Sequence, residues 1–305
     1  MSCKYIKKQI CKSSKTIAGF TVDANENVYF TLARDGLWKV NENENNGVPQ
    51  SLVKIRGSER LPIVWNANDN AIYICESGGS RLFQYSVNTG KLSTFAGSLK
   101  GGHQDGDLKD ATFSCPSAIA VDKNGDLYIT EAGQNVIRKV NMEKKIVESV
   151  PECISTTDAV TVRGGTIYAV SARKNQITKI KNGITSTINF ASNLDDIHPF
   201  EIIIIMETDE TCLIGYERGL LLRLNISNNR VDTIIELNEN FFFRHLALDR
   251  EGNLFVATTG GCLWKFTPIW RYSRYLWIGH LKEEGYCPLS TIPTDIIKEI
   301  ARHIQ

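Results

Sequence analysis

Long apolar runs are absent from this sequence, and so is an excess of charge of either sign. The longest aliphatic run, residues 202–206, is far shorter than the roughly 20 residues that a membrane-spanning helix needs. The 35 basic residues are almost balanced by 34 acidic ones. This balance excludes a protein that attracts nucleic acid or an anionic membrane through its net charge, so any such binding would need a local patch.

Export signals and metal-binding cysteine pairs are also missing. Residues 1–15 are rich in lysine and lack the apolar core of a signal peptide. The eight cysteines are widely spaced and form no Cys-x-x-Cys pair, which argues against a zinc module. We therefore expect reduced, mostly buried thiols in a cytoplasmic protein that carries no metal or cofactor.

What the sequence does contain is a repeat. Residues 118–140, 17–40 and 244–266 match one another, and in each an Asp precedes an aromatic residue by six positions. Weaker copies cover residues 62–86, 158–180 and 200–224, so six copies recur every 40 to 55 residues or so. A fixed period of this length is typical of stacked structural repeats.

Each copy consists of short alternating apolar runs separated by turns such as Asn124-Gly125, which is the pattern of antiparallel strands. Four such strands form one blade of a β-propeller, and a lone blade cannot bury both of its faces. The sequence therefore predicts an all-β, six-bladed β-propeller. The last copy has only three strands, so we expect residues 4–12 to pair with residues 261–266 and remove an exposed edge.

The junction between the second and third copies resembles the NHL-repeat family of β-propellers. The residues that carry the resemblance are Gly97, Gly102, Asp105, Gly106, Ala111, Phe113, Pro116, Asp122, Gly125, Tyr128 and Asn135. The glycines permit positive φ in the crossover between blades, Asp105 can bond loop amides, and Ala111 with Phe113 would fill the gap between blades. The resemblance implies that these residues build the scaffold, while binding takes place on the loop faces.

The composition changes after Pro268, and this divides the chain into a propeller domain, residues 1–268, and a helical extension, residues 269–305. Pro293 opens a segment with apolar residues at helical spacing, which predicts a short amphipathic helix. The segment resembles the start of an F-box, and similar tails occur in repeat-rich proteins of amoebae and large DNA viruses. The candidate partner-binding residues of the tail are Leu289, Pro293, Ile296, Ile297, Ile300 and Ile304. The helix either packs on the propeller or binds a ubiquitin-ligase adaptor.

No catalytic constellation stands out, because the five histidines occupy unrelated positions. We expect His103 to be a solvated loop residue, and Asn66 and Glu201 to be hydrated channel walls. The sequence thus favours a non-catalytic protein-interaction scaffold that binds through the loop faces of the propeller. In this interpretation the propeller recruits a substrate for ubiquitin ligation and the tail binds the ligase adaptor. Two alternatives remain open: a metal-dependent hydrolase or lyase of the lactonase type, and an RNA-binding NHL propeller. Basic residues close to loops, among them Arg138, are matched by acidic ones, which disfavours RNA.

Overall fold

The structure of the chain is a computed structural model. It describes residues 5–268, apart from the gaps 42–43, 45–46, 133, 135, 152–158, 172–173, 175, 190–202, 207–210, 216–219, 229–230, 237–242, 250 and 259. The predicted helical extension, residues 269–305, lies outside the described residues, and so do all six candidate residues of the tail. No helix in the described part of the chain is long and apolar enough to cross a bilayer.

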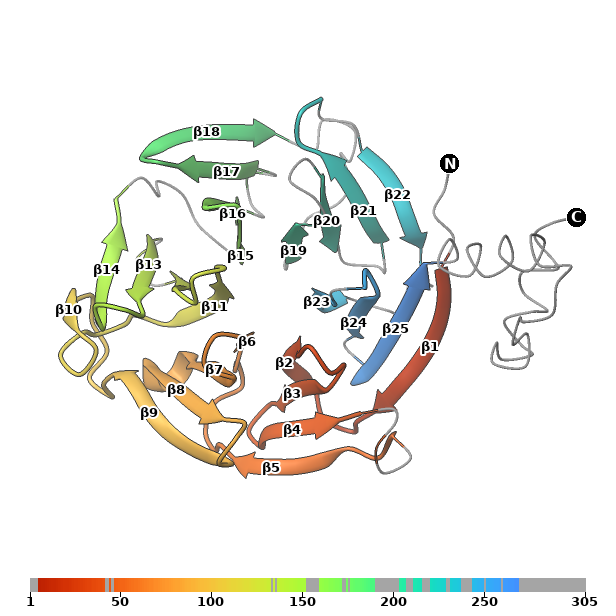
Figure 1. Cartoon of the computed structure of the whole chain (residues 1–305), viewed down its shortest axis with the longest axis horizontal. Coiled ribbons are helices and arrows are strands. Elements are labelled where there is room, and N and C mark those ends of the chain that lie inside the picture. Colours follow the sequence, from red (N-terminus) through yellow and green to blue (C-terminus); the bar gives the residue numbers. More distant parts are fainter. Residues whose placement is uncertain are drawn as a thin grey trace, which may run out of the picture.

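The described strands form six antiparallel sheets around a common centre, which makes the chain an all-β propeller (Figure 1). The first sheet contains β2 (Ile17–Val22), β3 (Val28–Leu32), β4 (Gly36–Val40) and β5 (Gln50–Lys54). The second contains β6 (Ile63–Asn66), β7 (Ala71–Glu76), β8 (Arg81–Ser86) and β9 (Lys91–Gly97). The third contains β10 (Gly106–Asp107), β11 (Pro116–Val121), β12 (Leu127–Glu131), β13 (Val136–Asn141) and β14 (Ile146–Val150).

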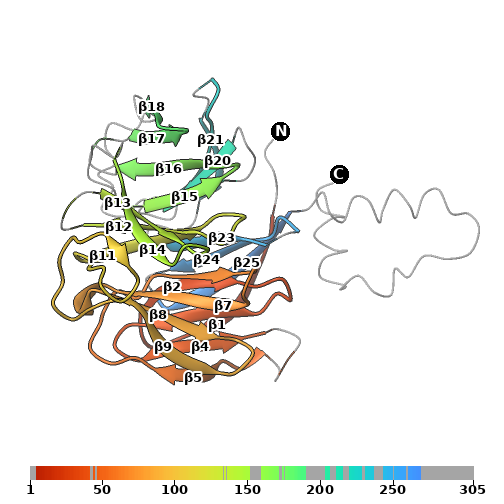
Figure 2. The same cartoon turned by 60° about the vertical axis from the view of Figure 1, so that its left-hand side comes forward.

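The remaining three sheets follow in chain order around the ring (Figure 2). The fourth contains β15 (Ala159–Arg163), β16 (Thr166–Ser171), β17 (Gln176–Lys181) and β18 (Ile184–Asn189). The fifth contains β19 (Ile203–Met206), β20 (Thr211–Gly215), β21 (Leu220–Asn225) and β22 (Val231–Glu236). The sixth contains β23 (Phe243–Leu248), β24 (Leu254–Thr258), β25 (Cys262–Pro268) and, from the N-terminus, β1 (Tyr5–Lys12). Each repeat copy of the sequence thus supplies one sheet.

The ring is closed by the start of the chain, as the sequence predicts. Strand β1 lies antiparallel to β25, with Cα partners running from Tyr5 and Pro268 to Lys12 and Cys262. A register shift between Gln9 and Cys11 bends the pair. Because β1 pairs with the outer edge of β25, the backbone groups of β25 are satisfied on both sides.

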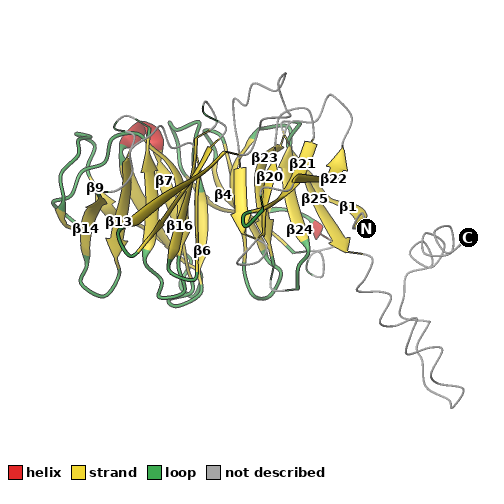
Figure 3. Cartoon of the chain, turned by 90° about the horizontal axis from the view of Figure 1, so that it is seen from above, coloured by secondary structure: helices red, strands yellow, loops and turns green. Residues whose placement is uncertain are grey.

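The core lies between neighbouring sheets, since each sheet packs both of its faces against others. The second strand of each sheet shows this best: all five residues of β3, β12 and β24 are buried. Strands β2, β6, β11, β15, β19 and β23 are innermost, and β5, β9, β10, β18, β22 and β1 are outermost. The ends of the strands and their turns form the two faces of a ring (Figure 3). Turns joining first to second strands gather on one face around the centre of the ring.

Candidate functional site

The turns around the centre of the ring are built by an acidic side chain that bonds its own backbone. The Oδ1 atom of Asp23 accepts hydrogen bonds from the amides of Asn25 (2.8 Å) and Asn27 (2.9 Å). Asp122 and Asp249 make the same pair of bonds in the third and sixth sheets. Asp and Asn favour such turns because their short side chains reach backbone amides two residues on. These carboxylates are therefore committed to holding the turns.

The second sheet has Asn66 in the same place. Its Oδ1 atom accepts a hydrogen bond from the Asn68 amide (3.0 Å), and its Nδ2 atom donates to the carbonyl of Gly125 (3.0 Å) in the next sheet. Only 2% of Asn66 is exposed. Asn66 does line the cavity at the centre of the ring, as predicted for a channel wall, but it is not a hydrated side chain, because its buried amide group bridges two sheets. Glu201 lies outside the described residues.

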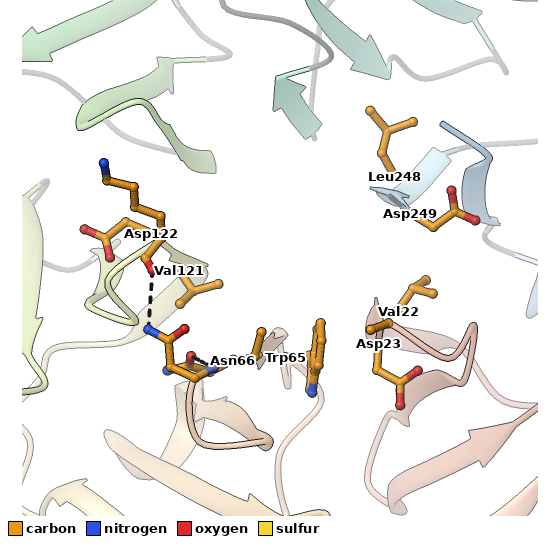
Figure 4. Close-up of a pocket in the computed structure, with 12 residues that line it drawn as sticks. Val22, Asp23, Trp65, Asn66, Val121, Asp122, Leu248 and Asp249 are labelled. Atoms are coloured by element: carbon orange, nitrogen blue, oxygen red, sulfur yellow. Dashed lines mark hydrogen bonds between the residues drawn. The ribbon is translucent and has the colours of Figure 1, made fainter. Parts of the chain in front are cut away.

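A cavity of about 430 Å³ opens between these turns (Figure 4). Its apolar walls come from residues of the innermost strands that stand directly before the turn-forming Asp or Asn: Val22, Trp65, Val121 and Leu248. Polar atoms reach the cavity from Asn66, Asn68 and Lys123, among others. A volume of this size is within the range of small-molecule pockets. These four residues are not predicted from the sequence as site residues, although the repeat places each of them directly before the turn residue.

A group of three carboxylates lies beside the same turns. Oxygen atoms of Glu26, Asp249 and Glu251 lie within 4.8 Å of one another. Carboxylate oxygens are the ligands that calcium prefers. Glu26, however, already pairs with the Nζ atom of Lys265 at 2.9 Å, and Asp249 holds its own turn. The ion pair with Lys265 neutralises the charge of Glu26.

A second polar centre lies at the junction of the second and third sheets, around the buried guanidinium of Arg138. Its Nη1 atom donates to Glu131 Oε1 (3.0 Å) and its Nη2 atom to Asp105 Oδ1 (2.7 Å). The side chains of Arg138 and Glu131 are both fully buried. The assignment of Arg138 to a solvated basic surface is therefore wrong: it ties the crossover loop to the third sheet.

His103 belongs to this centre too. Its Nδ1 atom lies 2.7 Å from Glu131 Oε2, and its Nε2 atom lies 3.2 Å from the hydroxyl of Ser149. His103 is an exposed loop residue, as expected, but its ring is not merely solvated: both ring nitrogens have protein partners, and one third of the side chain is exposed. The Ser149 hydroxyl also bonds Asp105 Oδ1 at 3.0 Å, so the serine is held by two partners. Ser149, His103 and Glu131 thus form a continuous series of hydrogen bonds. The same series also bonds Asp105 and Arg138, which gives it a structural role.

Asp105 does more than bond loop amides. Burial alone would raise the pKa of Asp105, but hydrogen bonds from the Ser149 amide and hydroxyl and the charge of Arg138 bring this pKa below its usual value. The ionised form is therefore the one that holds the crossover. The contact between Asp105 and Ser149 joins residues that lie 44 positions apart, so sequence spacing alone does not reveal it.

The other motif residues occupy the same junction. Gly97, Gly102 and Gly106 have positive φ. Ala111 and Phe113 are fully buried in the cluster between the second and third sheets, and strand β11 begins at Pro116. Gly125 and Tyr128 lie in and after the turn that Asp122 holds. Asn135 lies outside the described residues. The motif thus gathers around one junction and does not converge on the cavity, apart from Asp122.

Comparison with known sequences gives short, distant matches. No known family profile matches the chain. Over 110 residues it is 29% identical to Protein SUPPRESSOR OF QUENCHING 1, chloroplastic, of Arabidopsis thaliana, and over 79 residues it is 28% identical to NHL repeat-containing protein 2 of Gallus gallus. The matches cover 36% and 26% of this chain, but only 10% and 11% of the two relatives.

Comparison with solved structures gives matches over most of the chain. Virginiamycin B lyase from Staphylococcus aureus has a TM-score of 0.63 at 14% identity, covering 87% of this chain and 99% of that one. A gluconolactonase from Xanthomonas campestris has a TM-score of 0.68 at 12% identity, covering 87% and 90%. A chain of a nidogen/laminin complex has a TM-score of 0.56 at 12% identity, covering 72% and 80%. At such identities the likeness concerns the fold alone, and that fold is the β-propeller.

Proposed function

We propose that the chain is a divergent, six-bladed NHL-type propeller that acts as a non-catalytic protein-interaction module. One observation carries the proposal: the carboxylates around the central cavity are engaged in their own turns, whereas the walls of the cavity are apolar. A pocket with this lining suits binding better than acid–base or metal chemistry, which needs polar groups free to meet a substrate. The short match to an NHL repeat-containing protein supports the choice of family.

The test places a photo-crosslinking amino acid at Ala67, which lines the cavity, or at Glu59, an exposed residue in the crossover between the first and second sheets. Both replaced side chains reach solvent, so neither substitution should disturb the core. We expect specific crosslinks to a cellular protein from position 67 and none from position 59. Failure to crosslink any protein from the cavity face would contradict the proposal.

A metal-dependent hydrolase or lyase is the second candidate, because the neighbours in fold include a lyase and a gluconolactonase and because Glu26, Asp249 and Glu251 lie close together. The two candidates differ in their response to calcium. A ligand that binds the native state raises the melting temperature as its concentration rises. Our proposal expects an unchanged melting temperature in millimolar calcium, and a clear rise that Asp249→Asn abolishes would favour the enzyme.

RNA binding receives less support from the same face. Single-stranded RNA requires a positive groove with stacking aromatics. Here the turns around the cavity carry Asp23, Asp69, Asp122 and Asp249, and their only described lysine is Lys123. This excess of acidic side chains would repel a phosphate backbone.

The tail adds a proposal that rests on sequence alone: its apolar residues would dock in a groove of a ubiquitin-ligase adaptor. Removing residues 288–305 should abolish capture of purified adaptor, and equal capture by the truncated chain would refute this. A cytoplasmic location fits the thiols of Cys11, Cys75, Cys115 and Cys262, which form no disulfide within the described residues.

A further inference from the structure

Four apolar side chains hold the same position in four different sheets. Each directly precedes the Asp or Asn that forms the turn, and its strand partner is apolar: Val22 with Val28, Trp65 with Ile72, Val121 with Leu127, and Leu248 with Leu254. All four are partly exposed and line the central cavity. We call these four residues the apolar collar. The repeat therefore presents apolar surface to one point, where a single apolar group could touch several sheets.

The collar is held in place before any ligand arrives. The indole Nε1 of Trp65 donates to Asn70 Oδ1 at 3.2 Å, and the amide of Trp65 donates to Thr21 Oγ1 of the first sheet at 3.0 Å. The ring extends toward the centre of the cavity (Figure 4). A pocket that is already ordered loses little entropy when it is filled, which raises its affinity for a fitting group.

The rim around the collar is acidic. Among the described residues in or flanking the first turns there are two cations, Lys123 and Arg163, against seven carboxylates: Asp23, Glu26, Asp69, Asp122, Asp126, Asp249 and Glu251. Glu26 and Asp126 form ion pairs with Lys265 and Lys139.

Four of the other carboxylates accept hydrogen bonds from neutral groups: Asp23, Asp69, Asp122 and Asp249. A neutral donor satisfies the oxygen but does not cancel the charge. The rim thus keeps a negative field around an apolar pocket, which favours cations at short range.

We propose that the apolar collar receives one aliphatic or aromatic side chain of a basic peptide segment, whose lysines or arginines face the acidic rim. This inference rests on the proposed interaction function and names the chemistry of its partner. The apolar side chain supplies the buried anchor that dominates many interfaces. The flanking cations supply attraction that weakens with salt.

The test uses fluorescence anisotropy with a labelled peptide of sequence KKGGLGGKK and the full-length protein. Two matched peptides replace the leucine with glycine or all lysines with glutamate. We expect the first peptide to bind at least about tenfold more tightly than either matched peptide, because it alone has both anchor and charge. The affinity should fall steeply between 0.05 and 0.5 M salt, since exposed charges are screened there.

Variants of the protein locate the site. Trp65→Ala and, as a milder change, Val121→Thr should weaken binding of KKGGLGGKK about tenfold and a few-fold, respectively. Asp122→Asn should weaken it at low salt only, and the turn should survive, because Asn66 already forms this turn in the second sheet. Glu143→Lys, in the exposed outer turn of the third sheet, is the control and should leave the affinity within about twofold after screening.

The outcomes separate this inference from the function on which it rests. Equal binding by the wild type, Trp65→Ala and Val121→Thr would overturn the collar as the site. No binding of the basic peptide, together with protein crosslinks at position 67, would overturn the peptide chemistry and leave the interaction function standing. If both the peptide and the crosslinks are absent, both are overturned.

Discussion

Replacing Arg138 with methionine is the sharpest test of how this propeller holds its second and third sheets together. The fully buried guanidinium donates to two carboxylates, Glu131 and Asp105, and to the carbonyls of Thr112 and Gln104, both at 2.9 Å. Methionine has a similar length but none of these donors. It would leave the charge of Glu131 buried without its guanidinium partner.

Breaking a buried ion pair by removing one partner costs about 3–5 kcal/mol of unfolding free energy. We expect the loss of unfolding free energy in Arg138→Met to fall in that range. Arg138→Lys should recover little of this loss, because an ammonium group cannot bridge two carboxylates and two carbonyls as the planar guanidinium does. The double variant Arg138→Met with Glu131→Gln should lose less than the sum of the two single variants, since the fully buried charge of Glu131 is gone and the remaining carboxylate partner, Asp105, is half exposed.

The assay is equilibrium unfolding in urea, followed by circular dichroism and tryptophan fluorescence to check that one transition is observed. The matched control is Arg34→Met: Arg34 pairs with Glu59 at the surface, where the two side chains are 69% and 66% exposed, so its loss should cost about 0–1 kcal/mol. If Arg138→Met unfolds within about 1 kcal/mol of the wild type, the reasoning that assigns this cluster its structural role is refuted.

Three further changes test other parts of the fold. Deleting residues 1–12 removes β1 and bares the edge of β25, so we expect a lower melting temperature by calorimetry and aggregates by size-exclusion chromatography; a stable monomer would contradict the closure. Gly36→Ala should lower the unfolding free energy by several kcal/mol, because a Cβ at Gly36 would clash with the Val53 carbonyl oxygen. The control is Gly57→Ala, where the Cβ would face open space, and we expect its loss to be smaller by about 2 kcal/mol or more. Equal losses in urea unfolding would refute this reasoning. The lowered pKa of Asp105 means that its ionised form stabilises the fold above the unfolded-state pKa of about 3.8, and this contribution is lost as the pH falls through the lower folded-state value. Asp105→Asn should therefore flatten the stability curve on the acid side of pH 4, measured as urea midpoints from pH 3 to 7, and an unchanged slope there would count against the assignment.

Much of the fold could be read from the sequence because it depends on local patterns. Alternating apolar residues and Asp, Asn and Gly turns identify strands wherever they occur, and their recurrence identifies the repeat. The closure by residues 4–12 also followed from counting strands, since the last copy lacked one. Strand β10 was missed because two residues, Gly106 and Asp107, are too few to show any period.

The candidate site was harder to predict, since it depends on contacts between distant residues. Arg138 was read as a surface cation and Asn66 as a hydrated wall, because a lone polar residue in a strand carries no local sign of a buried partner. Their partners come from other repeats or from the crossover: Asn66 bonds Gly125, 59 residues away, and Arg138 bonds Asp105, 33 residues away. Residues that lie so far apart in the sequence form no local pattern from which their contact could be predicted.

The amino-acid order by itself determined the all-β class, the repeat and the strand that seals the ring, because hydrophobic period and turn chemistry act within a few residues. Only the tertiary structure decided which side chains meet: that Val22, Trp65, Val121 and Leu248 surround one cavity, and that His103, Glu131 and Arg138 form one hydrogen-bonded cluster. Radial packing brings equivalent positions of separate repeats to a single point, and no local pattern contains that information.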